Sequence, residues 1–167
     1  MNKQDRKLLE KLANFLYNIG AETEREEFDD KTALVLTYAV DDETLPEECT
    51  VTIEHPAADL TAIQMMISVF YDLDEKTTEE AAKLLPIMNS ILEMGCFGVI
   101  RSEGCVYFNY AFIVDGLDDS GMIISTVTAF DIITQTAREG RNILAPLVVG
   151  DKKAEDYNND DALIVQI

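Results

Sequence analysis

The sequence contains few of the residues that most often carry out chemistry. It has one histidine and no tryptophan among 167 residues. The histidine, His55, alternates with Val51 and Ile53, which is the pattern of an ordinary residue at the end of a strand. No Gly-x-Ser-x-Gly segment accompanies it, so the sequence lacks the nucleophile elbow of a hydrolase. We therefore predict no catalytic residue and a protein that is not an enzyme.

Motifs that bind metals or cofactors are also missing. Zinc sites need clusters of cysteine and histidine at ligand spacing, and the sequence has none. The acidic segments 41–48 and 115–121 lack the combination of alternating oxygen ligands, central glycine and closing glutamate found in an EF-hand loop. Gly95 and Gly98 stand apart with no Lys-Ser/Thr pair after them, unlike a phosphate-binding loop. The sequence therefore predicts no metal and no cofactor.

Cysteine is scarce and unpaired. Cys49, Cys96 and Cys105 make an odd number with no Cys-x-x-Cys pair, which favours a reducing compartment. In the hairpin predicted below, Cys105 would face about Arg101. Cys96 would face about Tyr110, so the two thiols are too far out of register for a disulfide. We expect all three cysteines to be buried and to pack as small apolar groups.

The sequence also lacks long apolar runs and has few basic residues. No run approaches the ~20 apolar residues that cross a bilayer, and residues 1–6 lack the apolar core of a signal peptide. Thirteen basic residues stand against 32 acidic ones, giving a net charge of −19. Such a chain is repelled by nucleic acid and by anionic membranes. We expect a cytoplasmic protein whose acidity keeps it soluble or attracts a basic partner.

The chain has enough apolar residues to fold as one domain. Hydrophobic residues make up 47% of it, and its length suits a single domain with its own core. We predict an α+β domain over residues 1–149. Residues 150–167 then form a flexible acidic tail that ends in the apolar, strand-like segment 162–167. That end would dock on the same chain, on a dimer mate or on a partner.

The most strongly patterned stretch is a helix followed by a hairpin, over residues 77–114. Thr77 and Glu80 have the spacing of a capping box, Gly95 would stop the helix, and Pro86 predicts a kink or a helix start. An apolar stripe recurs at helical spacing: Ala81, Leu84, Leu85, Met88, Ile91 and Leu92. A short strand over 97–101, a turn at 102–104 and a longer strand over 105–114 follow. The longer strand is apolar on both faces, so we place it in the middle of a sheet.

The flanking segments complete the predicted fold. Before the central helix we expect a helix over 3–19 that Gly20 ends, a solvated connector over 22–30, and three strands: 32–40, 49–55 and 63–73. A helix is the alternative for 63–73. Residues Pro56–Leu60 end the preceding strand. After the hairpin we expect a helix over 122–138, capped by Ser120. Gly140 would interrupt it, and 143–149 would continue it beyond Pro146.

These elements predict an α+β fold with a five-stranded antiparallel sheet and helices packed on it, in the order α-β-β-β-α-β-β-α. The sequence resembles the YbjN-like family and, more broadly, the type III secretion chaperone-like fold. The likeness rests on three segments: residues 83–92 with Asn89 near their end, the Gly-Cys-Phe-Gly of residues 95–98, and the aromatic strand 106–110. Pro86 and the apolar C-terminus depart from the pattern.

The resemblance implies an acidic, often dimeric cytosolic protein that binds other proteins and performs no chemistry. We therefore expect a protein-binding module, with a protein partner and a homodimer. Candidate interface residues are Leu84, Met88, Ile91, Leu163 and Val165. One alternative is a small-molecule-binding regulator or an enzyme that uses a pocket between sheet and helices, with polar contacts from Tyr107, Asn109 and Tyr110. Another is a structural domain whose partner is a second copy of itself.

Overall fold

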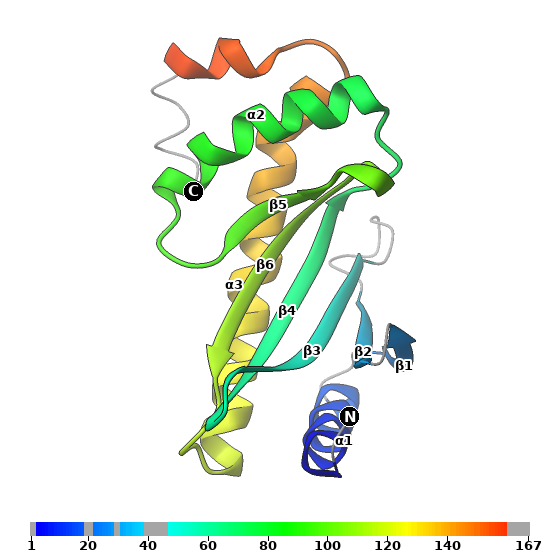
Figure 1. Cartoon of the computed structure of the whole chain (residues 1–167), viewed down its shortest axis with the longest axis vertical. Helices are drawn as coiled ribbons and strands as arrows, with labels where there is room; N and C mark the ends of the chain where they lie inside the picture. Colours follow the sequence, from blue (N-terminus) through cyan, green and yellow to red (C-terminus); the bar gives the residue numbers. More distant parts are fainter. Residues whose placement is uncertain (1–2, 19–21, 29–30, 39–46, 160–167) are drawn as a thin grey trace. The chain divides into compact units, whose positions relative to one another are not determined.

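A computed structural model of the chain describes residues 3–18, 22–28, 31–38 and 47–159. Over these residues the protein has three α-helices and a six-stranded antiparallel sheet, so the predicted α+β class is confirmed (Figure 1). The helices are α1 (Lys3–Asn18), α2 (Glu75–Ile91) and α3 (Asp119–Val148). The strands are β1 (Glu22–Phe28), β2 (Lys31–Tyr38), β3 (Glu47–Ala57), β4 (Leu60–Phe70), β5 (Cys96–Ile100) and β6 (Cys105–Ile113). Their order in the sheet is β1-β2-β3-β4-β6-β5.

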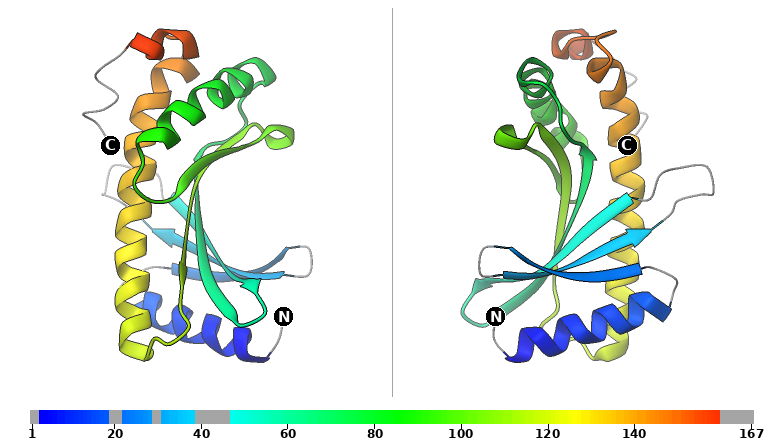
Figure 2. Two further views of the ribbon diagram at one scale, coloured as in Figure 1. Left: turned by 60° about the vertical axis from the view of Figure 1, so that its left-hand side comes forward. Right: turned by 90° about the vertical axis from the view of Figure 1, so that its right-hand side faces the viewer.

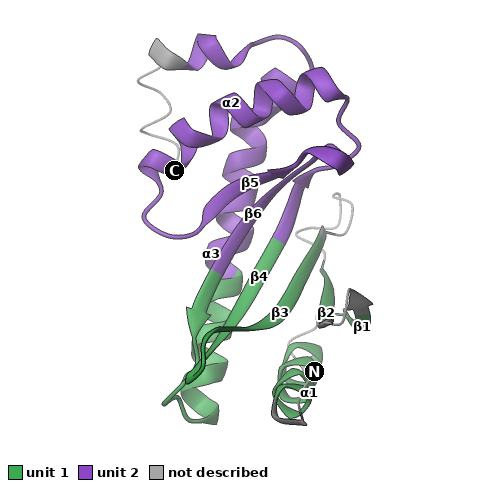
Figure 3. Ribbon diagram, in the orientation of Figure 1, with its two compact units in different colours: residues 1–66, 111–130 green, residues 67–110, 131–167 purple. Residues whose placement is uncertain are grey.

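The chain divides into two compact units (Figure 3). Unit 1 consists of residues 1–66 and 111–130, and unit 2 of residues 67–110 and 131–167. The strands β4 and β6 and the helix α3 therefore contribute residues to both units. The predicted domain boundary at residue 149 stays a prediction.

Unit 1 contains α1 and the first three strands. Leu9, Leu12 and Leu16 of α1 are buried, and α1 contacts β1 (Figure 2). The charged edges of these elements also meet, because Arg25 Nη1 of β1 lies 3.7 Å from Glu10 Oε1 of α1. Buried apolar residues of this unit include Leu9, Leu12, Leu16, Leu34, Leu36, Cys49, Val51, Ile63 and Met65.

The segment predicted as a solvated connector is instead the strand β1. It pairs with β2 in antiparallel register, from Glu22 opposite Thr37 to Phe28 opposite Lys31. This strand raises the sheet from the predicted five strands to six and changes the element order to α-β-β-β-β-α-β-β-α. The charged sequence of β1 did not predict a strand, because glutamate has low strand propensity. Charged residues are nevertheless common on edge strands, where they discourage pairing with other chains.

The next three predicted strands are confirmed with shifted ends. The strand β3 runs through Pro56 to Ala57, so Pro56 does not end it. Pro56 lies beyond Val51, the last β3 residue that pairs with β2, and its missing N–H therefore interrupts no bond to that strand. The segment predicted as a strand over 63–73 is the strand β4, so the alternative of a helix there is wrong. The predicted Gly20 stop of the first helix and residues 41–46 of the acidic segment 41–48 lie outside the described residues, whereas Glu47 and Glu48 belong to β3.

In unit 2, the helix α2 begins earlier than the sequence suggests. Its N-cap is Asp74, whose carboxylate accepts hydrogen bonds from the backbone N–H and the hydroxyl of Thr77, each at 2.9 Å. Thr77 is therefore a donor to the cap and is not the cap itself. The helix continues through Pro86, which starts no new helix. It ends at Ile91, and the C-cap residue Leu92 has an extended backbone conformation. Gly95, with φ +75°, belongs to the following turn and is not the helix stop.

The predicted hairpin is confirmed, with its register shifted by one residue. Ile100 lies opposite Cys105, and Cys96 opposite Asn109. A short 3₁₀ turn, η1 (Arg101–Glu103), and Gly104 in left-handed conformation make the connection. The strand β6 lies between β4 and β5, as its apolar faces predict. Its Phe108 is fully buried, and the ring centroid lies 4.9 Å from that of Phe97.

The last helix, α3, is longer than predicted and continuous. It passes through Gly140 and Pro146 without a break. The ring of Phe97 occupies the space in which a Cβ atom of residue 140 would lie, so this position of the helix favours glycine. The start of α3 is capped by Asp118 and not by Ser120, because Asp118 Oδ1 accepts the Gly121 N–H at 2.7 Å.

The residues after α3 are partly structured, which corrects the prediction of a flexible acidic tail. A second 3₁₀ helix, η2 (Ala154–Asn159), contacts α2. Tyr157 is buried, and its hydroxyl donates to the Ile143 carbonyl at 2.7 Å. The predicted strand-like end at residues 162–167 lies outside the described residues.

Candidate functional site

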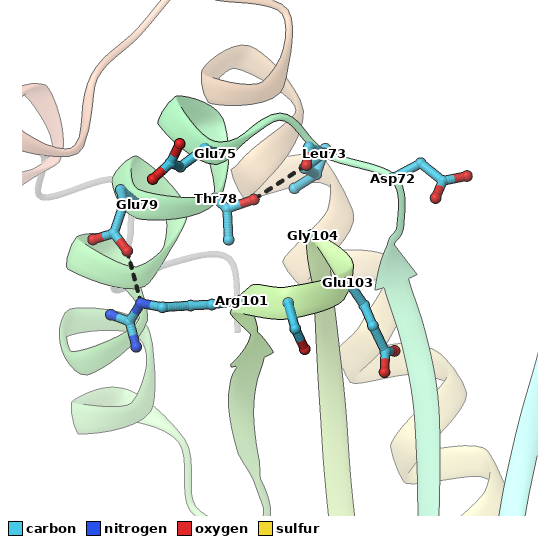
Figure 4. A pocket seen from close by; sticks show the side chains of 9 residues that line it. Asp72, Leu73, Glu75, Thr78, Glu79, Arg101, Glu103 and Gly104 are labelled. Atoms are coloured by element: carbon cyan, nitrogen blue, oxygen red, sulfur yellow. Dashed lines mark hydrogen bonds and ion pairs between the residues drawn. The ribbon is translucent and has the colours of Figure 1, made fainter.

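Unit 2 carries a cleft of about 540 Å³ beside the start of α2 (Figure 4). It is bounded by the β4–α2 connection, the first two turns of α2 and the β5–β6 turn. We call it the acidic cleft, because four carboxylates and a single guanidinium line it. Its lining residues are Asp72, Leu73, Glu75, Thr78, Glu79, Arg101, Ser102, Glu103 and Gly104.

Backbone contacts hold the walls of the acidic cleft together. The Leu73 N–H donates to the Gly104 carbonyl at 3.1 Å. Gly104 has φ +58°, and the Leu73 backbone occupies the space of a Cβ atom there, so glycine is required on both counts. Thr78 Oγ1 donates to the Asp74 carbonyl at 2.8 Å. Asp72 also has a positive φ of 55°, an uncommon conformation for a residue with a side chain.

The charges of the acidic cleft do not converge on one point. Glu79 Oε1 accepts from Arg101 Nε at 2.7 Å, which neutralises one carboxylate. Figure 4 shows the carboxylates of Asp72, Glu75 and Glu103 pointing in different directions. Among the described residues, no group of three or more acidic, cysteine or histidine side chains is arranged to hold a metal ion. The cleft can therefore attract cations through its field, but its carboxylates do not act as a pair.

A second feature is a group of exposed apolar side chains at one end of unit 1. We call Leu60, Ile113, Leu117 and Ile124 the apolar end; they are 37%, 53%, 42% and 66% exposed. Hydrogen bonds place their segments together, because the Val114 N–H donates to the Thr61 carbonyl at 3.0 Å and the Leu117 N–H donates to the Val114 carbonyl at 3.2 Å. Figure 1 shows the start of β4, the end of β6 and the start of α3 at its lower end.

Three of the five predicted interface residues, Leu84, Met88 and Ile91, are described, and they lie on α2 in unit 2. Leu84 and Met88 are fully buried in unit 2, so they form its core and present no surface to a partner. Ile91 is partly exposed near the end of α2. Leu163 and Val165 lie outside the described residues. Of the three described residues, only Ile91 reaches the surface, so these three do not form an exposed surface together.

The polar residues proposed for a small-molecule pocket do not line the acidic cleft. Tyr107 packs its ring over Gly98, its direct partner across the hairpin. The Tyr110 hydroxyl lies 3.7 Å from the Met94 sulfur. Asn109 is partly exposed and pairs opposite Cys96. The acidic cleft was missed because its residues come from three separate turns, which no sequence pattern connects.

All three cysteines have free thiols, as the register of the hairpin predicts. Cys49 and Cys105 are buried, whereas Cys96 is exposed, which corrects the prediction for that residue. Burial raises the pKa of the Cys49 thiol to about 12, and it also raises the pKa of Cys105. The two buried thiols therefore stay protonated and behave as apolar groups at neutral pH.

The single histidine makes a pair in unit 1. His55 Nε2 lies 3.1 Å from Asp5 Oδ1, which joins β3 to α1. The Asp5 side chain is largely buried, while that of His55 is 43% exposed. This contact gives His55 a structural role in unit 1.

Comparison with known proteins adds no family assignment. The sequence matches no protein-family model, and no curated protein matches it significantly. Among the described residues, no helix combines the length and the apolar character that crossing a bilayer requires.

Proposed function

We propose that this protein is a non-enzymatic, cytoplasmic protein-binding module, similar to YbjN-like and secretion-chaperone-like proteins, that holds or regulates another protein. The observation that carries the proposal is the apolar end, where four large apolar side chains from neighbouring segments are exposed. Burying one such side chain fully contributes about 1.5–3 kcal/mol, so a partner that covers several of them gains substantial binding energy. Grouped exposed apolar residues are typical of protein interaction sites.

The charge of the chain supports a basic partner. With a net charge of −19, the protein produces a negative field that accelerates encounter with positively charged surfaces. We expect partner association to slow as salt is added, because salt screens exposed charges. The partner surface would combine an apolar centre with a basic rim.

A pair of matched variants tests the proposal in cells of the native host. The test variant is Leu117→Asp with Ile124→Asp, which places charge in the apolar end. The control is Met94→Asp with Val149→Asp, which changes two exposed apolar residues of unit 2 in the same way. We expect wild type and control to retain the same protein on affinity capture, and the test variant to lose it. Equal capture by test and control variants would refute the apolar end as the binding surface.

The homodimer belongs to the same proposal and needs its own measurement. Sedimentation of the wild-type chain at several concentrations should give a dimer that dissociates on dilution. If the test variant stays dimeric, the apolar end serves another protein. If it becomes monomeric, the apolar end is the contact between copies, as in the alternative of a self-associating structural domain.

The acidic cleft favours the second candidate, a regulator that binds a small molecule. Its volume of about 540 Å³ lies in the range of ligand pockets, and its carboxylates select a cation. A thermal-shift screen of cationic small molecules should then find a stabilising ligand. Glu75→Gln with Glu103→Gln should abolish that stabilisation. Glu93→Gln, at an exposed position outside the cleft, should leave it unchanged.

A further inference from the structure

A second cleft in unit 2 is lined by more basic than acidic side chains, in contrast to the acidic composition of the whole chain. Its volume is about 500 Å³, and it lies between α2 and the segment that follows α3. We call it the lysine cleft. Its charged lining residues are Lys76, Lys83, Lys152, Lys153, Asp74, Glu80 and Glu155. Four of the 13 basic residues of the chain therefore line one cleft, against three of the 32 acidic residues.

Two of the three carboxylates in the lysine cleft are occupied by hydrogen bonds. The N–H and hydroxyl of Thr77 bind Asp74, and they lower the pKa of this carboxyl. Glu80 accepts from Lys83 Nζ at 2.5 Å and from the Ala154 N–H at 3.2 Å, and its pKa is lowered as well. These carboxylates fasten α2 to itself and to η2, so they remain charged and fixed.

The lysines approach the cleft from two elements. Lys76 and Lys83 come from α2, whereas Lys152 and Lys153 precede η2. The Glu80 carboxylate raises the pKa of Lys83, which keeps this side chain cationic. Lys152 Nζ lies 4.7 Å from the centroid of the Tyr157 ring, which positions its charge near the buried end of η2. Lys76 and Lys153 are exposed at the surface, and Lys153 Nζ lies 3.8 Å from Glu155 Oε1, an exposed ion pair that a more highly charged anion can displace.

We propose that the lysine cleft binds a small molecule that carries a phosphate or diphosphate group, with Lys76 and Lys153 as contacts from its two sides. An ammonium group binds phosphate as a point charge, and several of them around one cleft suit a compact polyanion. The start of α2 is not the binding element, because the Asp74 carboxylate already occupies it. A long polyanion such as nucleic acid does not fit, because the surrounding chain is acidic. This inference is independent of the proposed protein-binding function.

Isothermal titration of the full chain with sodium pyrophosphate and with inorganic phosphate tests this inference. We expect saturable binding of pyrophosphate, tighter than that of phosphate because the diphosphate group carries more charge. Lys76→Gln and Lys153→Gln should each weaken binding about tenfold, since each removes one charged contact. Backbone amide signals of residues 150–155 should shift on titration with wild type.

Lys7→Gln is the matched control, because it removes the same charge from an exposed position of α1 in unit 1. It should leave the affinity for pyrophosphate unchanged. The inference is overturned if pyrophosphate fails to saturate, or if the three variants weaken binding equally. It is also overturned if sodium sulfate at equal ionic strength produces the same amide shifts. Circular dichroism of each variant verifies that the chain remains folded.

Discussion

The side-chain amide of Asn89 makes two hydrogen bonds to the backbone of Phe97. Asn89 Nδ2 donates to the Phe97 carbonyl at 2.9 Å, and the Phe97 N–H donates to Asn89 Oδ1 at 2.8 Å. Phe97 lies on β5, an edge strand of the sheet. The amide of α2 therefore takes the place of a neighbouring strand at this position. It joins the helix to the hairpin and blocks pairing with another chain there.

Replacing Asn89 should destabilise unit 2 more than a typical surface substitution. Asn89→Ala leaves the N–H and the carbonyl of Phe97 without these partners, and we expect a loss of about 1–3 kcal/mol. Ser90→Ala is the control, because the neighbouring hydroxyl is exposed and bonds only within its helix, to the Ile87 carbonyl. It should change stability by less than about 0.5 kcal/mol. Urea unfolding of both variants measures the difference, and equal midpoints would contradict the role of Asn89.

Gly140 should be a rare helix position at which alanine destabilises. Alanine normally stabilises a helix interior by about 1 kcal/mol relative to glycine. Here a Cβ atom would overlap the ring of Phe97, so we expect Gly140→Ala to cost about 1–3 kcal/mol instead. Phe97→Leu together with Gly140→Ala should recover part of that loss relative to the sum of the two single changes. Additive losses in thermal unfolding would show that the two residues do not interact.

The segments that carry the family resemblance form this helix–hairpin junction. Asn89 bonds Phe97, Phe97 packs on Gly140, and Tyr107 covers Gly98. The resemblance thus rests on residues that have a structural role in the fold. Periodicity predicted the helices and most strands, because burial of one face leaves a repeating pattern in the sequence.

Other features left no such pattern. The strand β1 is charged because it lies at a sheet edge, and only its pairing with β2 reveals it. Gly140 lies inside α3 at a position where the ring of Phe97, distant in sequence, leaves no room for a Cβ atom. Both clefts combine residues from separate turns, and charge alone does not indicate which turns meet. Leu84 and Met88, predicted as interface residues, are buried in unit 2, because an apolar stripe on a helix marks a core as well as an interface.

The three thiols should differ sharply in reactivity. Cys96 is exposed, whereas Cys49 and Cys105 are buried with raised pKa values. Because the thiolate is the reactive form, a thiol reagent such as Ellman's reagent should modify Cys96 rapidly in the native protein at pH 8. Cys49 should react only after unfolding. Cys96→Ser should remove the fast phase, whereas Cys49→Ala should leave it intact. A fast phase that survives Cys96→Ser would contradict the assignment.

Asp74 should make the stability of α2 depend on pH in the acidic range. The backbone N–H and the hydroxyl of Thr77 lower the pKa of this carboxyl in the folded protein below its usual value of 3.8. The unfolded chain therefore takes up the proton first as the pH falls. The stabilisation is fully present above the unfolded value and is lost as the pH falls through the folded value. Asp74→Asn keeps a capping side chain but removes the charge.

The unfolding temperature of Asp74→Asn should accordingly be lower than that of wild type at pH 7. The difference should shrink as the pH falls below 3.8, because wild-type Asp74 then becomes neutral as well. Glu93→Gln removes the same charge from an exposed position beyond α2, and its difference from wild type should be small at pH 7. A difference for Asp74→Asn that stays constant down to pH 2 would mean that the lost interaction is not with the carboxylate. The stabilisation of α2 would then come from the shape of the cap and not from its charge.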